Sequence, residues 1–329
     1  MPNDPLSELL AERGVLLADG ATGTTLFDMG LESGEAPELW CEHHPERVAA
    51  LHRGFIDAGA DIVLTNSFGG SRHRLKLHGA DGRVRELNEL AATIARSEAD
   101  KAKRKVLVAG SVGPTGELLE PLGALSADGA KDAFVEQIEG LKAGGVDLVW
   151  IETMSAADEM RAAIEASLAC DLPCVVTASF DTAGRTMMGL TPAEMAGVAD
   201  GAVAYGANCG VGASDILASL LTMTGDKPLV VKGNCGIPQF RGAEIHYSGT
   251  PEQMAEYARL AIDAGASVIG GCCGTTREHV AAMRAAIDGH ERAVRPTVET
   301  IVERVGPLVN DVPGKPGPKR ERRTRRRAA

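Results

Sequence analysis

The stretch AGASVIGGCCGTT, residues Ala264–Thr276, contains the pattern that decides the fold. A glycine-containing turn, AGAS, leads into the short apolar run SVIGG, which ends at the adjacent cysteines Cys272 and Cys273. Similar turns, AGAD at Ala58–Asp61 and GGVD at Gly144–Asp147, precede two other apolar runs. Continuous runs of this length, rich in β-branched residues, are typical of strands that are buried on both faces of a parallel sheet.

Such apolar runs recur along the chain, and helical patterns separate them. The runs are Val15–Ala18, Ile62–Thr65, Val106–Gly110, Leu148–Ile151, Cys174–Ser179, Ala202–Asn208, Leu229–Gly233 and Ser267–Gly271. Eight strand–helix units in a chain of this length predict an α/β fold, a (β/α)8 TIM barrel in a single domain. The alternative is an open doubly wound sheet, but the loop DGATGT at Asp19–Thr24 lacks the G-x-G-x-x-G motif expected there.

The intervening segments carry helix signals. Val48, Leu51 and Phe55 fall on one face of a helix that Pro45 opens. Thr191–Pro192 and Thr250–Pro251 each combine an N-cap residue with proline at the first helical position, so they predict two further helix starts.

Composition excludes several classes of protein. The chain has 329 residues, 44% of them hydrophobic, and no apolar run long enough to cross a membrane as a helix. Residues 313–329 hold eight basic residues and one acid, so the rest of the chain is more acidic than the net charge of −11. An acidic body argues against a nucleic-acid surface. We therefore expect a barrel with a C-terminal extension over residues 1–308 and a disordered basic tail over residues 309–329.

The chain has no recognisable secretory signal at its N-terminus, so we expect a cytoplasmic, reducing setting for its seven cysteines. Cysteines in that setting are more often metal ligands or core residues than disulfides. Cys209 lies in GANCG, at the end of the sixth run, and Cys272–Cys273 follow the eighth. If the three converge, they form a zinc site with an open fourth position. The alternative is a set of unrelated core cysteines.

Polar residues also stand at the ends of other runs, where barrel enzymes place their active sites. Asp19 and Glu152 each close an apolar run with a single acid, which is a costly place for an unpaired charge. They can bind a substrate ammonium group or cap nearby loop amides. None of the eight histidines directly follows a run, which disfavours metal-dependent hydrolysis.

The motifs DGATGT, GANCG, KGNCG and GGCCGTT together resemble the homocysteine S-methyltransferase family over Val15–Ile287. The resemblance implies a zinc-dependent barrel that methylates homocysteine to methionine. It implies Cys209, Cys272 and Cys273 as Zn2+ ligands and catalytic residues. It further implies that Asp19 and Glu152 hold the homocysteine amino group, that Gly20 helps to bind the amino acid, and that Asn234 lies at the site wall. Cys235 is a neighbour of the site in this comparison, not a ligand.

The sequence indicates the methyl donor less clearly than it indicates the methyl acceptor. SGEAPELW (Ser33–Trp40), TNSFGG (Thr65–Gly70) and SFDTAGRTMMG (Ser179–Gly189) resemble the short bacterial betaine-homocysteine S-methyltransferases, which favours betaine. A quaternary ammonium often requires an aromatic cage, and only 3% of this chain is aromatic. The aromatic candidates near the mouth are Trp40, Phe68 and Phe180; Arg185 is a candidate for a donor carboxylate or for a surface ion pair.

Other readings stay open. The donor can instead be S-methylmethionine, S-adenosylmethionine or a partner corrinoid protein. A different class of function is a non-catalytic zinc- or thiol-dependent regulatory protein on the same barrel. A homo-oligomer is compatible with the sequence, and membrane association is not expected.

Overall fold

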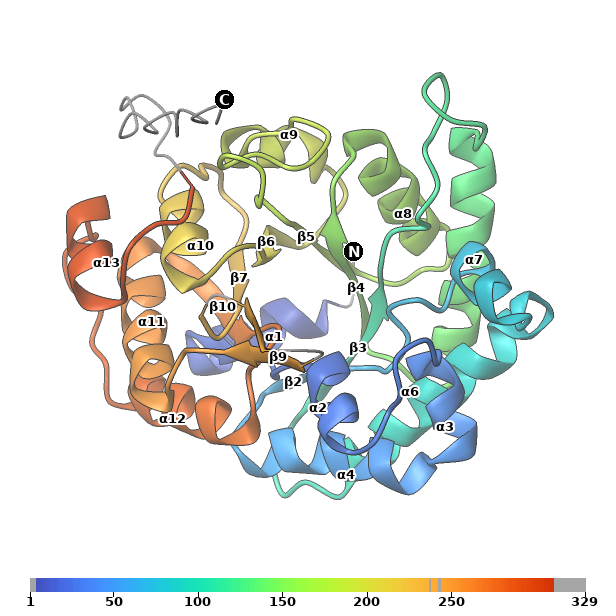
Figure 1. Cartoon of the computed structure of the whole chain (residues 1–329), viewed down its shortest axis with the longest axis horizontal. Helices are drawn as coiled ribbons and strands as arrows, with labels where there is room; N and C mark the ends of the chain where they lie inside the picture. The colour runs from blue at the N-terminus through green and yellow to red at the C-terminus, as the bar shows by residue number, and fades with distance from the viewer. Residues whose placement is uncertain (1–3, 237, 242–243, 311–329) are drawn as a thin grey trace, which may run out of the picture.

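The computed structural model describes residues 4–236, 238–241 and 244–310. Eight parallel strands form one sheet in the order β1-β10-β7-β6-β5-β4-β3-β2, and a parallel bridge between Ala18 and Ile62 joins its two ends. Figure 1 looks along this ring of strands, with the helices arranged around it. The predicted (β/α)8 TIM barrel is confirmed.

The strands coincide with the apolar runs of the sequence. The barrel strands are β1 (Leu16–Leu17), β2 (Ile62–Leu64), β3 (Leu107–Val112), β4 (Leu148–Met154), β5 (Cys174–Ala178), β6 (Ala204–Cys209), β7 (Leu229–Gly233) and β10 (Ala266–Gly271). A further antiparallel pair, β8 (Pro238–Arg241) and β9 (Glu244–Tyr247), is inserted between β7 and the next helix. The sequence analysis did not predict this pair.

Helices connect the strands and cover the outside of the ring. The α-helices are α1 (Pro5–Arg13), α2 (Thr22–Asp28), α3 (Trp40–His43), α4 (Pro45–Asp57), α5 (Arg72–Leu75), α6 (Val84–Asp100), α7 (Ala127–Ala143), α8 (Ala157–Ala169), α9 (Met195–Val198), α10 (Ala213–Leu220), α11 (Pro251–Ala264), α12 (Arg277–Asp288) and α13 (Val298–Arg304). Short 3-10 turns are η1 (Pro37–Leu39), η2 (Lys76–His78), η3 (Asp81–Arg83) and η4 (Pro192–Glu194). Both predicted helix starts are confirmed, and Thr191 and Thr250 each form a capping box.

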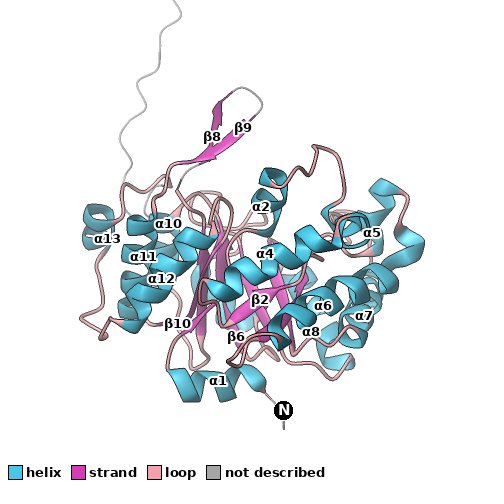
Figure 2. Ribbon diagram, turned by 90° about the horizontal axis from the view of Figure 1, so that it is seen from below, coloured by secondary structure: helices cyan, strands magenta, loops and turns pink. Residues whose placement is uncertain are grey.

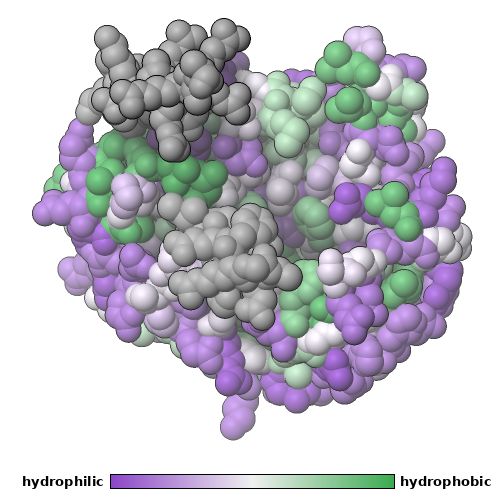
Figure 3. Space-filling model, viewed as in Figure 1, coloured by the Kyte–Doolittle hydropathy of each residue, from purple (hydrophilic) through white to green (hydrophobic). Residues whose placement is uncertain are grey.

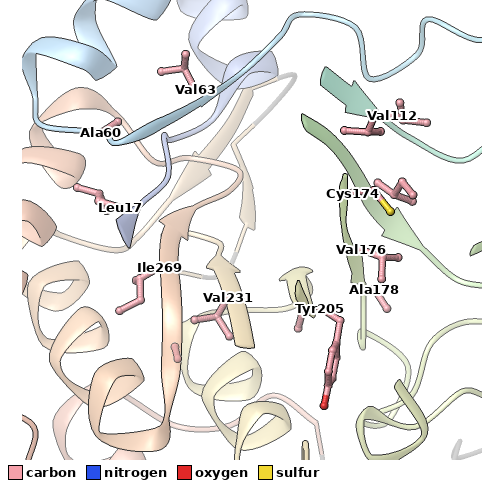
Figure 4. Close-up of a cluster of buried hydrophobic side chains, with 14 of the residues drawn as sticks. Leu17, Ala60, Val63, Val112, Cys174, Val176, Ala178, Tyr205, Val231 and Ile269 are labelled. Carbon is pink, nitrogen blue, oxygen red and sulfur yellow. The ribbon is translucent and has the colours of Figure 1, made fainter. Parts of the chain in front are cut away.

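Successive side chains of each strand point alternately to the outside and to the inside of the ring, and they belong to two separate hydrophobic cores. Leu17, Val231 and Ile269 pack outward against the helices, as Figure 4 shows. Their neighbours Val230 and Val268 point into the ring and form the inner core. Because both faces of every strand are buried in this way, the strands read as continuous apolar runs.

The two ends of the barrel are built differently. Helix α1 lies across the N-terminal end, where Leu6 and Leu9 are fully buried in the inner core together with Trp150. The β8–β9 hairpin rises from the opposite end, as Figure 2 shows. The open end is therefore the one at which the strands finish.

A buried ion pair reinforces the seam between β1 and β2. Lys232 on β7 reaches Asp19 directly after β1, with 2.6 Å between Nζ and Oδ1. The second carboxylate oxygen of Asp19 accepts a hydrogen bond from the backbone N–H of Leu64 on β2, at 2.7 Å. Gly270 lies between them on β10, and a Cβ there would stand 3.0 Å from the Lys232 side chain. The missing side chain at Gly270 thus lets the lysine cross to β1.

The end of the chain agrees only in part with the expected tail. Val309 and Asn310 donate backbone hydrogen bonds to the Asp215 carboxylate, at 3.0 and 2.8 Å. The remainder of the predicted tail, residues 311–329, lies outside the described residues, so its disorder stays a prediction. Within the part of the chain that the structure describes, no helix is both long and apolar enough to cross a membrane.

Removing one member of the buried ion pair is expected to weaken the fold strongly. Lys232→Met leaves the Asp19 charge buried without its cation, which typically costs about 3–5 kcal/mol. Urea unfolding of the variant should show this loss. The double variant Asp19→Asn/Lys232→Met removes both charges and should recover much of it. Equal stability of Lys232→Met and the wild type would contradict a structural role for the pair.

His52 on α4 predicts an acid-sensitive stability. Its side chain is fully buried, and neither ring nitrogen has a hydrogen-bond partner among the described residues. Burial lowers the pKa of His52 to about 4, whereas an unfolded chain protonates histidine near about 6.5. The unfolded state therefore binds the extra proton first, and stability falls as the pH drops from about 6.5 towards 4.

From pH 7 to pH 5, this histidine should contribute a loss of about 2 kcal/mol in the free energy of unfolding. We expect His52→Leu to lack this contribution. Urea unfolding of both proteins at the two pH values isolates it, because all other titrating groups are shared. Identical pH slopes would argue against a neutral, buried His52.

Candidate metal centre and substrate pocket

The strand register brings three cysteines together at the open end of the barrel. Cys209, the last residue of β6, pairs with Gly233 of β7, which in turn pairs with Gly271 of β10. Cys272 and Cys273 directly follow β10, and the backbone N–H of Cys272 still bonds to Gly233, at 2.8 Å. The three sulfur atoms all lie within 4.8 Å of one another. The expected convergence of the trio is thus present, and zinc ligation by it stays a prediction.

A strained backbone aims Cys209 at the other two sulfurs. Its φ is 61°, in the left-handed region, and Thr153 at the end of β4 has the same value. Asn208, the residue before Cys209, holds Thr153: its Oδ1 accepts the Thr153 N–H at 2.8 Å, and its Nδ2 donates to Thr153 Oγ1 at 2.7 Å. Non-glycine residues in this region cost of order 1 kcal/mol or more and persist only where the surroundings hold them.

Asn234 lies beside the cluster, and its place at the wall of a substrate site stays a prediction. Its Nδ2 donates to the Gly210 carbonyl at 2.6 Å and lies 3.7 Å from Cys209 Sγ. Cys235, the next residue, turns away and contacts His279, with 3.0 Å between Sγ and Nε2. Cys235 is therefore a neighbour of the site and not a member of the trio.

The electrostatics of the trio suit a cation. Hydrogen bonds from Cys209 and Cys272 lower the pKa of Cys273, whereas the same contacts raise the pKa of Cys209. One thiol of the three therefore ionises more easily than the others, because three thiolates this close together would repel one another. A divalent metal removes that restriction, and zinc prefers deprotonated cysteine ligands in groups of three or four. The donor set therefore fits zinc.

Tyr247, at the end of β9, is a site residue that the sequence analysis missed. Its side chain forms a hydrogen bond with Cys273. Gly274 makes room for it, because a Cβ there would stand 2.2 Å from the tyrosine ring. The sequence did not indicate that Tyr247 lies beside Cys273, because its position depends on the β8–β9 hairpin, which was not predicted.

A cavity of about 500 Å³ extends from the cysteines to the mouth of the barrel. All three cysteines line it, and so do Gly20 and Glu152. Gly20 has no space for a side chain, because a Cβ would stand 2.5 Å from the Thr275 carbonyl oxygen. The trio thus faces a space that can hold small molecules.

Glu152 places a carboxyl group inside this cavity. It is buried, and Ser111 Oγ donates to its Oε1 at 2.5 Å. Burial raises the pKa of Glu152 to about 7. A bound ammonium group would favour the ionised carboxylate, so Glu152 is well suited to hold one.

Asp19 occupies a different position from Glu152. It is fully buried and does not line the cavity, and its two oxygens are engaged by Lys232 and Leu64. A direct role in holding the substrate amino group stays a prediction. Lys232 does line the cavity, and sequence analysis missed it. Burial alone lowers the pKa of Lys232, but the Asp19 and Glu152 carboxylates outweigh this effect and raise it, so the lysine is charged.

Of the side chains suggested for the donor, Phe68 alone lines the cavity with the cysteines. Trp40 and Phe180 do not line this cavity and are buried, with 2% and 4% of their surface exposed. Arg185 donates to the Gly189 carbonyl in an exposed turn. Figure 3 shows the face that carries the mouth, where apolar groups interrupt a largely hydrophilic surface.

Comparisons with known proteins agree with this geometry. Methionine synthase from Mycobacterium leprae (strain TN) is 32% identical over an aligned length of 304 residues, and the match covers 86% of this chain and 25% of that protein. The Mycobacterium tuberculosis (strain ATCC 25618 / H37Rv) methionine synthase is 32% identical over 316 residues, covering 88% of this chain and 26% of that protein. The chain therefore spans about a quarter of the length of these relatives.

A solved structure of a complete homocysteine methyltransferase chain also matches this protein. The homocysteine methyltransferase MmuM from Escherichia coli, in its metallated form, superposes with a TM-score of 0.70 and 26% identity. The match covers 86% of this chain and 99% of that one. A family model described as homocysteine S-methyltransferase matches residues 16–287. On this evidence the chain is a methyltransferase and belongs to the homocysteine S-methyltransferase family.

Proposed function

We propose that the protein transfers a methyl group from a small onium donor, with betaine favoured, to homocysteine, and that it requires zinc bound by Cys209, Cys272 and Cys273. The observation that carries the proposal is the convergence of three sulfurs within 4.8 Å at the wall of a cavity that also contains the Glu152 carboxylate. When bound, the zinc ion would lower the pKa of a thiol substrate, so that its sulfur is nucleophilic near neutral pH.

The chain's own residues mainly position the substrates. Glu152, oriented by Ser111, holds the homocysteine ammonium group. Asn208 bonds to Thr153, and Asn234 lies beside the Cys209 sulfur at the cavity. The methyl group then passes in one substitution: its bond to the donor heteroatom breaks, that atom keeps the electron pair, and a carbon–sulfur bond forms. No proton moves at the methyl carbon, so orientation is the main contribution of the protein.

Betaine is favoured by the motifs shared with the short bacterial enzymes. A second candidate is a module that takes its methyl group from a separate corrinoid protein, and the likeness to one quarter of two methionine synthases supports it. A cytoplasmic location belongs to this proposal and rests on seven free cysteines. A homo-oligomeric state stays a prediction.

A donor panel tests the proposed activity. Zinc-loaded protein is mixed with homocysteine and betaine, S-methylmethionine or S-adenosylmethionine, and methionine is measured. We expect methionine from the free onium donors, with betaine giving the highest kcat/KM. Absence of methyl transfer from every onium donor would reject the proposal. Activity restored only by a methylated corrinoid protein would support the second candidate instead.

Substitution of the cysteines tests the metal. We expect one zinc per chain in the wild type. Cys272→Ala should lose both the bound zinc and methionine formation, because only two of the three protein ligands remain. Cys170→Ala is the matched control, since Cys170 lies at the end of α8, outside the trio. Full zinc content in Cys272→Ala would show that the metal, if bound, lies elsewhere.

A further inference from the structure

Each of the three cysteine sulfurs lies beside a different side-chain donor, and the pairs are Cys209 with Asn234, Cys272 with Asn208, and Cys273 with Tyr247. The amide nitrogens of the two asparagines lie 3.7 and 4.0 Å from their sulfurs. The donors come from separate parts of the chain: β6, the residue after β7, and the end of β9. An inference about them rests on the proposed function, because it concerns which sulfur receives the methyl group.

The orientation of the Asn208 amide is fixed by its other partners. Its Oδ1 accepts the backbone N–H of Thr153 at 2.8 Å and the hydroxyl of Thr177 at 2.7 Å. Exchanging oxygen and nitrogen would set two N–H donors against each other, so Nδ2 must face the other way. One hydrogen of Nδ2 goes to Thr153 Oγ1 at 2.7 Å, which leaves the second for Cys272.

The Asn234 amide is fixed in a similar way. Its Nδ2 lies 2.6 Å from the carbonyl oxygen of Gly210, which can only accept a hydrogen bond. The second hydrogen on Nδ2 is therefore left for Cys209. Asn208 and Asn234 are both buried, so bulk water does not compete for these hydrogens.

Tyr247 is held beside the cysteines by packing. Its ring lies against Gly274, the residue after Cys273, where a Cβ would stand 2.2 Å from the ring. The side chain also packs against the outer hydrophobic core. A phenol has one proton to donate, and here Cys273 receives it. The three donors thus have no hydrogen left for a fourth sulfur at the open position of the trio.

A hydrogen bond makes a thiolate less reactive towards a methyl group. The thiolate is the nucleophilic form of cysteine, and an N–H or O–H donor stabilises its negative charge. The charge disappears as the sulfur gains the methyl group, so the hydrogen bond weakens in the transition state and the barrier rises. A sulfur that lacks such a bond is methylated faster. Three cysteine ligands and a substrate thiol therefore need not react alike.

We propose that Asn208, Asn234 and Tyr247 protect the cysteines from methylation and so direct the methyl group to the substrate sulfur. They act through the cysteines and do not touch the donor. Loss of one of them would make its cysteine a competing acceptor: the bond from the methyl carbon to the donor heteroatom breaks, that atom keeps the electron pair, and a bond to Sγ forms. The product is a neutral thioether, which is a poorer zinc ligand than a thiolate.

Methyl iodide tests the proposal without any assumption about the natural donor. Zinc-loaded protein is treated with it in the absence of homocysteine, iodide leaves with the electron pair, and peptide mass spectrometry gives the methylation rate of each cysteine. Tyr247→Phe keeps the ring and removes the proton. We expect it to raise the rate at Cys273 about 10-fold, the usual effect of losing a hydrogen bond to a charged group. The rates at Cys209 and Cys272 should change little.

Tyr205→Phe is the matched control. The Tyr205 hydroxyl donates to the carbonyl oxygen of Thr224 at 2.8 Å, outside the trio. We expect this variant to be methylated at the same rates as the wild type, and both tyrosine variants to keep full zinc content. Loss of zinc from Tyr247→Phe would overturn the proposal, because the phenol would then hold the metal site together and not tune its sulfurs.

Asn234→Ala provides an independent readout. It should raise the methylation rate of Cys209 and leave that of Cys273 unchanged. A general loosening of the site would instead raise the rates at all three cysteines in both variants, and that result would overturn the proposal. An unchanged rate at Cys273 in Tyr247→Phe would do the same.

The two proposals can fail separately. If the wild type forms methionine but Tyr247→Phe is methylated no faster at Cys273, the activity stands and the protective role is rejected. If the wild type binds zinc but uses no onium donor, the activity is rejected and the methyl iodide pattern alone decides the protective role. Failure of the wild type to bind zinc rejects both.

Discussion

The ion pair between Lys232 and Asp19 is the interaction on which the barrel depends most. Strand β1 is only two residues long, and a single bridge connects it to β2. The Asp19 carboxylate adds bonds to β2 and β7 at this weak point, so one side chain joins three strands. Gly270 leaves room for this crossing, because a Cβ there would stand 3.0 Å from both the Lys232 side chain and the Ala18 Cβ. A closed ring in turn fixes where each strand ends, and the site is assembled from those ends.

The same pair also affects the electrostatics of the cavity, because Lys232 lines it and Asp19 balances the lysine charge. Lys232 and Asp19 pair with each other, whereas Glu152 lines the cavity with only Ser111 as its hydrogen-bond donor among the described residues. The register of β6, β7 and β10 sets Cys209 against Cys272 and Cys273, and Asn208, the residue before Cys209, is bonded to Thr153 on β4. The positions of Glu152, of the three cysteines and of the cavity between them thus depend on how the strands pair, and no local motif determines them alone.

The sequence was sufficient for the ring and for the residues at its strand ends. Continuous apolar runs identified the strands because both faces are buried, and the motifs around Cys209 and Cys272 indicated the trio. Three features were missed for physical reasons. Lys232 stands in an apolar run and acquires its partner only across the ring. The β8–β9 hairpin, with Tyr247, is too short to show a clear period. Trp40 and Phe180 were expected near the donor, but both are needed to fill the core.

Helix α1 has a consequence for the order of events. Leu6 and Leu9 close the N-terminal end of the ring, so the cavity is reached from the strand ends. Glu152 is buried in the wall of that cavity and the trio is half-buried, whereas Arg74 is exposed at the rim. A molecule seated at the rim covers the one beneath it. Under the proposed function, homocysteine bound beside Glu152 would therefore have to enter before a donor seated at the rim.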